Sequence, residues 1–149
     1  MTTQSGTKNP SARERERGLK LYPQFDDKGL ICAVVQDHVS QRVLMVAWMN
    51  GESLALTQAT GYAHYWSRSR QTIWKKGETS GQLQRVVEMR VDCDQDALLL
   101  QVDVGGDGGC CHVGFETCFY RATVNGSGQL AQVEADPVPS GLTPPQPQA

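Results

Sequence analysis

Short apolar runs that are broken at close intervals limit what this chain can fold into more than any other feature of its sequence. Residues 30–37 and 41–48 are two such runs, and the turn near 38–40 between them predicts a β-hairpin. Residues 85–91 alternate apolar and charged side chains, which is typical of a strand that is buried on one face. The sequence therefore favours strands over long helices.

Three further segments are strand candidates, and one more is a helix candidate. The strand candidates are residues 63–67, 97–104 and 115–124. Leu54, Leu56 and Ala59 lie among good helix formers over residues 52–60, and Gly61 is suited to end that helix. The whole pattern predicts a β-rich α+β fold, with barrel-like antiparallel sheets and one or two short helices.

The two ends of the chain differ in composition from its middle. Residues 1–17 are polar and include a run of alternating charges at 13–17, which predicts a disordered, solvated tail. Residues 135–149 are rich in proline and lack periodicity, which predicts a second disordered tail. The 149 residues are then expected to form one domain, over residues 18–134.

Charge and cysteine content restrict the location and the partners. A net charge of −2 and an isoelectric point near 5.9 indicate no broad basic surface for nucleic acid or a membrane. The N-terminus lacks the apolar region of a signal peptide, and no stretch approaches the ~18 apolar residues of a membrane span. The five cysteines are odd in number and two are adjacent, which argues against a disulfide framework. A cytoplasmic protein with metal-binding or catalytic cysteines is expected.

Three aspartates follow the alternating strand at residues 92, 94 and 96. If the strand continues through them, their carboxylates share one face and Cys93 points to the other. Three such carboxylates repel one another unless a divalent cation neutralises them, and hard oxygen ligands suit Mg²⁺. The alternative is a solvated acidic turn without a metal.

Soft ligands occur at Cys93, Cys111 and Cys118, which together would bind Zn²⁺ and leave its fourth position to water. The alternative is that these cysteines are small buried apolar residues. His112 lies next to one of them and could act as a general base or proton shuttle. His38, at a turn, and His64, in a strand, are weaker candidates.

Basic and hydroxyl-bearing residues are concentrated in two short segments, at 66–70 and 74–81. In an extended segment Arg68 and Arg70 would share a face, and their guanidinium groups suit phosphate oxygens. Serine and threonine hydroxyls and glycine-flanked amides near residues 77–81 would add neutral donors, and the nearby tryptophans could stack on a base. A solvated basic loop is the alternative.

Five segments, taken in order, closely resemble the phosphoribosyl-AMP cyclohydrolase family of histidine biosynthesis. They are Trp48-Met49-Asn50, Ser67-Arg68-Ser69-Arg70, Trp74-Lys75-Lys76-Gly77-Glu78-Thr79-Ser80-Gly81, Asp92-Cys93-Asp94-Gln95-Asp96, and Cys111-His112-Val113-Gly114 with Cys118-Phe119-Tyr120-Arg121. The resemblance covers about residues 22–124. Any one motif would be weak, whereas five in sequence are specific.

The resemblance implies a hydrolase that opens the adenine ring of phosphoribosyl-AMP between N1 and C6, giving the formimino aminoimidazole-carboxamide ribotide. It implies an intertwined homodimer with the active site at the subunit interface, so the zinc ligands need not all come from one chain. The implied ligands are Cys93, Cys111 and Cys118 for zinc and Asp92, Asp94 and Asp96 for magnesium. The chain is expected to lack the pyrophosphohydrolase domain that is fused to some relatives.

The remaining site residues are assigned with the same resemblance in view. His112 is the predicted proton-handling residue. Two segments are predicted to hold the substrate's phosphates or to close over it, and their predicted substrate-binding residues are Ser67, Arg68, Ser69, Arg70, Trp74, Lys76, Glu78, Thr79 and Ser80. The family's small residue before the Cys-His pair is here Cys110, which competes with Cys111 for the ligand role.

Two other functions are compatible with a zinc site. A zinc deaminase would activate water in a related way, but the H-x-E…P-C-x-x-C signature is absent. A structural zinc or nucleotide-binding module is the second alternative, and an open three-cysteine site beside a histidine and three aspartates suits it poorly. Metal content measured together with activity discriminates among them.

Overall fold

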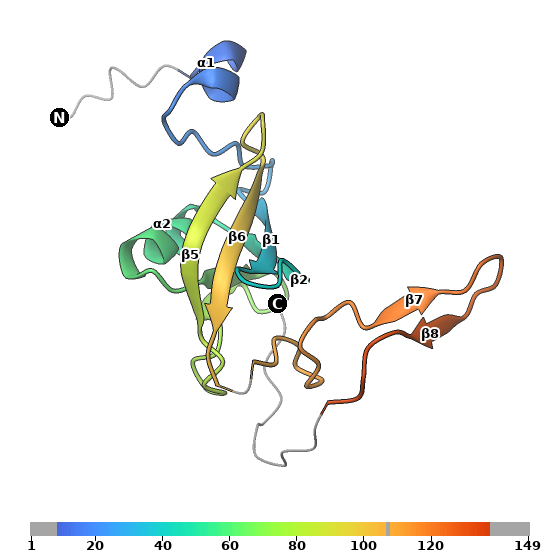
Figure 1. Ribbon diagram of the computed structural model, residues 1–149. Coiled ribbons are helices and arrows are strands. Elements are labelled where there is room, and N and C mark those ends of the chain that lie inside the picture. The colour runs from blue at the N-terminus through green and yellow to red at the C-terminus, as the bar shows by residue number, and fades with distance from the viewer. Residues whose placement is uncertain (1–8, 107, 138–149) are drawn as a thin grey trace.

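The computed structural model describes residues 9–106 and 108–137. Its largest sheet has the strand order β2-β1-β6-β5, formed by β1 (Ile31–Asp37), β2 (Val43–Met49), β5 (Gln84–Val91) and β6 (Ala97–Val104). Two hairpins are built from β3 (His64–Ser67) with β4 (Thr72–Lys75), and from β7 (Arg121–Thr123) with β8 (Leu130–Gln132). The helices are α1 (Ala12–Arg17) and α2 (Gly51–Thr60). Figure 1 shows their arrangement.

The sheet buries one face because side chains alternate along its strands. Ala33 and Val35 of β1 pair with Leu98 and Leu100 of β6, and these four residues and Ile31 are at most 1% exposed. Helix α2 and the β3–β4 hairpin pack over β2 on this face, where they complete the hydrophobic core. We call the opposite side the outer face; it carries Cys32, Val34, Val46, Trp48 and Leu99.

Local sequence explains why α2 begins and ends where it does. The Asn50 side chain accepts from the Ser53 amide at 2.8 Å, and the Ser53 hydroxyl oxygen accepts from the Asn50 amide at 2.9 Å. Reciprocal caps of this kind stabilise a helix by about 1 kcal/mol. Gly61 ends the helix with a positive φ of 79°. The predicted helix and its glycine stop are confirmed.

The β-rich α+β prediction is confirmed, and its details are corrected in two places. The sheets are not purely antiparallel, because β1 and β6 pair in parallel. The strand predicted over 115–124 is wrong: residues up to Thr117 form turns and bends, and only Arg121–Thr123 is a strand. The described strands form open sheets, with β2 and β5 at the edges of the largest. The barrel-like shape and the intertwined dimer stay predictions.

Helix α1 and strands β4 and β8 were not predicted. Helix α1 lies within the predicted N-terminal tail, where Ser11 and Glu14 form a capping box around the charge run. The β7–β8 hairpin, which we call the C-terminal arm, extends away from the main sheet, and its strand residues are all exposed (Figure 1). Most of the predicted proline-rich tail lies outside the described residues. None of the described helices is long and apolar enough to cross a membrane.

Candidate active site

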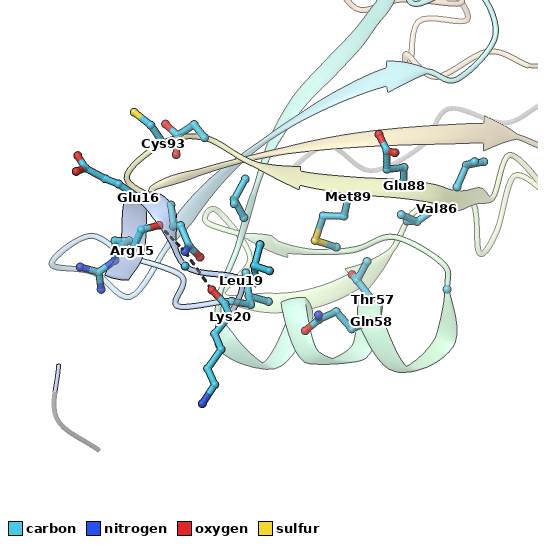
Figure 2. Close-up of a pocket in the computed structure, with 17 residues that line it drawn as sticks. Arg15, Glu16, Leu19, Lys20, Thr57, Gln58, Val86, Glu88, Met89 and Cys93 are labelled. Atoms are coloured by element: carbon cyan, nitrogen blue, oxygen red, sulfur yellow. Dashed lines mark hydrogen bonds between the residues drawn. The ribbon is translucent and has the colours of Figure 1, made fainter. Parts of the chain in front are cut away.

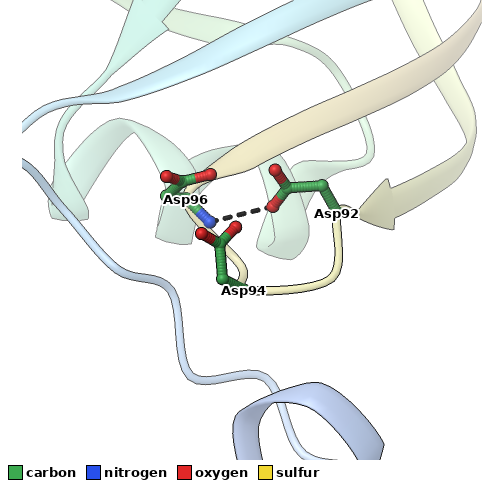
Figure 3. Close-up of side chains that lie close together, drawn as sticks. All are labelled: Asp92, Asp94 and Asp96. Carbon is green, nitrogen blue, oxygen red and sulfur yellow. Dashed lines mark hydrogen bonds between the residues drawn. The ribbon is translucent and has the colours of Figure 1, made fainter. Parts of the chain in front are cut away.

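The three aspartates lie on the turn that joins β5 to β6. One ligand oxygen from each of Asp92, Asp94 and Asp96 lies within 4.8 Å of the others, as Figure 3 shows. The Asp92 carboxylate accepts hydrogen bonds from the amides of Asp96 at 3.0 Å and Ala97 at 3.2 Å. Gln95 adopts a left-handed conformation with φ of 59°, which reverses the chain. The turn therefore brings three hard ligands together.

The predicted reason for this convergence is wrong. Strand β5 ends at Val91, so Asp92, Asp94 and Asp96 do not alternate along an extended strand. They gather because the chain folds back on itself, and the same turn leaves the Cys93 side chain exposed. A strand would have spaced carboxylates about 7 Å apart at every second residue, whereas the turn shortens the separation.

The crowding of these carboxylates perturbs their acidity. Hydrogen bonding to Asp92 and then Asp94, together with their charges, raises the pKa of Asp96 to about 6. Burial works to raise the pKa of Asp92, but hydrogen bonds from Asp96 and Ala97 outweigh it and lower that pKa. The turn therefore takes up a proton as the pH falls below about 6, and that proton would compete with a divalent cation.

Cation binding at this turn is expected to weaken as the pH falls through about 6, because the proton on Asp96 competes with the metal. One competing proton with this pKa weakens binding about tenfold at pH 5 relative to its plateau. Mn²⁺ titrations followed by water-proton relaxation, run between pH 5 and pH 8, measure the effect. A pH-independent affinity across this range would contradict it.

A cleft of about 710 Å³ adjoins the aspartate turn. The N-terminal segment 15–21 forms one wall, and β5 and the end of α2 form the others, as Figure 2 shows with Cys93 at one end and Thr57 and Gln58 along the helix. The buried Gln95 side chain fixes that segment: it accepts from the Tyr22 amide at 2.7 Å and donates to the carbonyls of Arg15 and Lys20. Sequence reasoning missed this role, because only the fold brings residue 95 to the N-terminal segment.

The other candidate zinc ligands lie on an irregular loop after β6. Cys118 lies against Cys111, and burial first and this neighbouring thiol second raise the pKa of Cys118 to about 12. Cys110 is fully buried in the core, where its Sγ accepts from Nε2 of Gln84 at 3.5 Å. Cys110 therefore faces the core, and Cys111 faces Cys118. The thiol pair favours Cys111 over Cys110 as the metal ligand.

Cys93 does not join this pair within one chain. It lies on the turn before β6, whereas Cys111 and Cys118 follow the other end of that strand. An eight-residue strand spans on the order of 25 Å. Among the residues that the structure describes, only the three aspartates form a group of three potential metal ligands.

The three histidines have different surroundings. His112 is exposed on the loop between Cys111 and Cys118. Nδ1 of His64 lies 2.8 Å from the Tyr62 carbonyl, and Nε2 of His38 lies 4.0 Å from the Asp103 carboxylate. His112 is thus the one that adjoins the candidate zinc thiols.

The first predicted phosphate segment forms the turn between β3 and β4, so Arg68 and Arg70 do not lie on one extended face as predicted. Ser67 is buried, and its hydroxyl accepts from the Arg70 amide at 3.2 Å. The Arg68 guanidinium lies over the Trp48 ring, 5.0 Å from its centroid. Ser69 and Arg70 are exposed. This turn leaves cationic and hydroxyl groups accessible near the outer face.

The second predicted phosphate segment is a tight turn after β4. Gly77 has a φ of 84°, and a Cβ there would lie 2.1 Å from the Gln82 carbonyl carbon, so the turn requires glycine. Glu78 and Thr79 are exposed and Ser80 is half-buried. Trp74 packs on Tyr65 at 5.2 Å, and its buried Nε1 has no hydrogen-bond partner in the described structure.

Lys76 differs from its neighbours on this turn. It is 1% exposed, and its Nζ donates to the Cys110 carbonyl at 2.6 Å. Burial lowers the pKa of Lys76, while the thiols of Cys110, Cys118 and Cys111 act in the opposite direction. Its ammonium is directed at the cysteine loop and is not open to a phosphate.

Comparisons with known proteins show which family the chain is similar to. The family model described as phosphoribosyl-AMP cyclohydrolase matches residues 45–120. A protein of that name from Caulobacter sp. (strain K31) is 59% identical over 112 residues, which cover 75% of this chain and 84% of the relative. Another from Brucella canis (strain ATCC 23365 / NCTC 10854 / RM-666) is 60% identical over 116 residues, which cover 78% and 84%. The chain belongs to the phosphoribosyl-AMP cyclohydrolase family.

Proposed function

We propose that this chain hydrolyses the adenine ring of phosphoribosyl-AMP at the N1–C6 bond, in histidine biosynthesis. The observation that carries the proposal is the family match over residues 45–120, which spans the phosphate segments, the aspartate turn and the cysteine loop. The reaction adds one water: its oxygen bonds to C6, the N1–C6 bond breaks, and N1 takes up a proton. The product is the formimino aminoimidazole-carboxamide ribotide.

The donor sets suit two different metals. Three thiols, at Cys93, Cys111 and Cys118, fit Zn²⁺ with one position left open, and the carboxylates of the aspartate turn fit Mg²⁺. When bound at such a site, zinc lowers the pKa of water toward 7 and supplies a hydroxide equivalent at neutral pH. His112, exposed beside Cys111, takes a proton from the attacking water and returns it to N1.

The substrate's charged end is matched by the two phosphate segments. Arg68 and Arg70 bind phosphate oxygens as charged donors, and Ser69, Thr79 and Ser80 supply hydroxyl groups around them. The buried Ser67 supports this turn, since its hydroxyl accepts from the Arg70 amide. Trp74 contributes an aromatic surface for the base, and the exposed carboxylate of Glu78 accepts hydrogen bonds from polar groups of the substrate. Lys76 does not contact the phosphate itself, because its ammonium is buried below the turn that carries Glu78, Thr79 and Ser80.

The active site is shared between two copies of the chain. Cys93 and the Cys111–Cys118 pair lie at opposite ends of β6, so a second copy is needed to bring the three thiols together. The outer face and the exposed C-terminal arm support this arrangement, since both leave apolar side chains such as Val46 and Leu130 uncovered. A two-fold axis would then build two equivalent sites.

A direct assay tests the proposed reaction. Purified protein incubated with phosphoribosyl-AMP is expected to form the ring-opened product, followed by its absorbance change, and to lose activity when a chelator removes its metal. Readdition of Zn²⁺ with Mg²⁺ is expected to restore the rate, because the thiols and the carboxylates bind different ions. A metal-free protein that still turns over at the original rate would rule out the metal-dependent mechanism.

A further inference from the structure

Lys76 lies at a place where a charged side chain costs free energy. Its side chain is 1% exposed, and burial of an ammonium group is unfavourable unless hydrogen bonds and opposite charges compensate it. None of the ion pairs in the described part of the chain includes Lys76. Its contacts are the Cys110 carbonyl, 2.6 Å from Nζ, and the Trp74 ring, whose centroid is 5.7 Å from Nζ.

The groups that face the ammonium belong mostly to the cysteine loop. The thiols of Cys110, Cys111 and Cys118 all interact with it electrostatically. Lys76 itself follows β4, in the small hairpin sheet. It therefore ties the β3–β4 hairpin to a loop that lies far away in the sequence.

The two halves of the cysteine loop are attached to the rest of the fold in different ways. Near Cys118 the loop is attached to β2, because the Cys118 amide donates to the Leu44 carbonyl at 2.7 Å and the Thr117 hydroxyl donates to the Val43 carbonyl at 2.8 Å. Near Cys111 the loop is held by backbone hydrogen bonds within itself: the Cys111 amide donates to the Phe115 carbonyl at 3.0 Å, and the Gly114 amide donates to the Cys111 carbonyl at 2.8 Å. The Cys110 carbonyl accepts from Nζ of Lys76 at 2.6 Å and the Cys110 Sγ accepts from Nε2 of Gln84 at 3.5 Å, and these side-chain contacts connect that half of the loop to other parts of the fold.

We propose that Lys76 is a positioning residue for the zinc site. Its ammonium holds the Cys110 carbonyl in place, so that Cys111 lies at a fixed distance from Cys118. The inference rests on the proposed zinc site. Three thiolates around Zn²⁺ carry a net charge of −1, and the buried ammonium balances that charge. Lys76 thus supports the metal ligands through its hydrogen bond to the Cys110 carbonyl and does not contact the substrate.

The test compares K76M, which keeps the length of the side chain and removes its charge and donors, with K75M on the adjacent residue. Zinc affinity, measured by competition with a chromogenic chelator, is expected to fall at least about tenfold in K76M, as for other residues that support metal ligands. In K75M it is expected to stay within about twofold of the wild type. An unchanged zinc affinity in K76M would overturn the inference.

Mn²⁺ binding at the aspartate turn separates local positioning from general unfolding. This turn lies at the other end of β6, so K76M is expected to bind Mn²⁺ as the wild type does. If K76M loses Mn²⁺ binding through misfolding, K76R decides: it keeps a charged donor and is expected to retain zinc, and a folded K76R that loses zinc tenfold overturns the inference. A wild-type protein without zinc affinity would instead refute the proposed function.

Discussion

Alanine substitution of Cys93 or of Cys118 is expected to abolish ring opening, and a mixture of the two inactive variants is expected to recover activity. In the proposed dimer each single variant loses one proposed zinc thiol from every site, so the loss should exceed about a thousandfold. The two cysteines lie at opposite ends of β6. In a mixed dimer one site combines both substitutions, and the other combines the intact Cys93 of one chain with the intact Cys118 of its partner.

The recovered activity has a defined size. After equal amounts of the two variants are unfolded and refolded together, random pairing makes half of the dimers mixed, and each has one intact site, so about one quarter of wild-type activity should return. Zinc content per chain should rise in the same proportion. If the mixture is shown to form mixed dimers but recovers no activity, the shared site is contradicted. Full activity in either single variant would contradict it as well.

C110A is the matched control for these substitutions. Cys110 is adjacent to Cys111 but directs its Sγ at Gln84 in the core, so we expect zinc binding not to require its thiol. The variant is expected to keep both its zinc and its activity, with a modest loss of thermal stability from the missing buried sulfur. Zinc loss in C110A comparable to that in C118A would reverse the assignment of the ligand role to Cys111.

Substitution of Asp94 by asparagine is expected to reduce Mg²⁺ affinity and the Mg²⁺-dependent rate by about 10- to 100-fold. The change keeps the shape of the side chain and removes one of three charges that lie within 4.8 Å. Isothermal titration with Mg²⁺ and rates measured across a range of Mg²⁺ concentrations provide the measurement. D27N, which alters an exposed carboxylate outside the group of three aspartates, serves as the control and should match the wild type.

The D94N substitution is also expected to change the pKa of Asp96. Asp94 is one of the two carboxylates that raise the pKa of Asp96 to about 6, so D94N is expected to lower the Asp96 pKa toward its ordinary value. The pH at which Mn²⁺ binding begins to weaken should then fall as well. An unchanged midpoint, together with wild-type Mg²⁺ dependence, would remove Asp94 from the metal site.

Much of the secondary structure could be predicted from local patterns alone. The alternation over residues 85–91 and the glycine after residues 52–60 act through neighbours along the chain, so β5 and α2 lie close to where they were expected. The strand expected over 115–124 failed for the opposite reason. Phe115 stacks on Tyr120 within the segment, Phe119 is exposed, and the Cys118 amide donates to the Leu44 carbonyl in place of a ladder partner.

The sequence by itself determined the family, the three aspartates and the candidate thiols, because residue types and their order are properties of the chain. Only the tertiary structure decided how they are brought together. A left-handed turn at Gln95 gathers the carboxylates, where an extended strand would have separated them. The length of β6 keeps Cys93 from Cys111 and Cys118, and the core contact of Cys110 separates it from its neighbour. Burial of Lys76 directs its charge to the cysteine loop, since a side chain's surroundings depend on contacts between distant segments that no local pattern records.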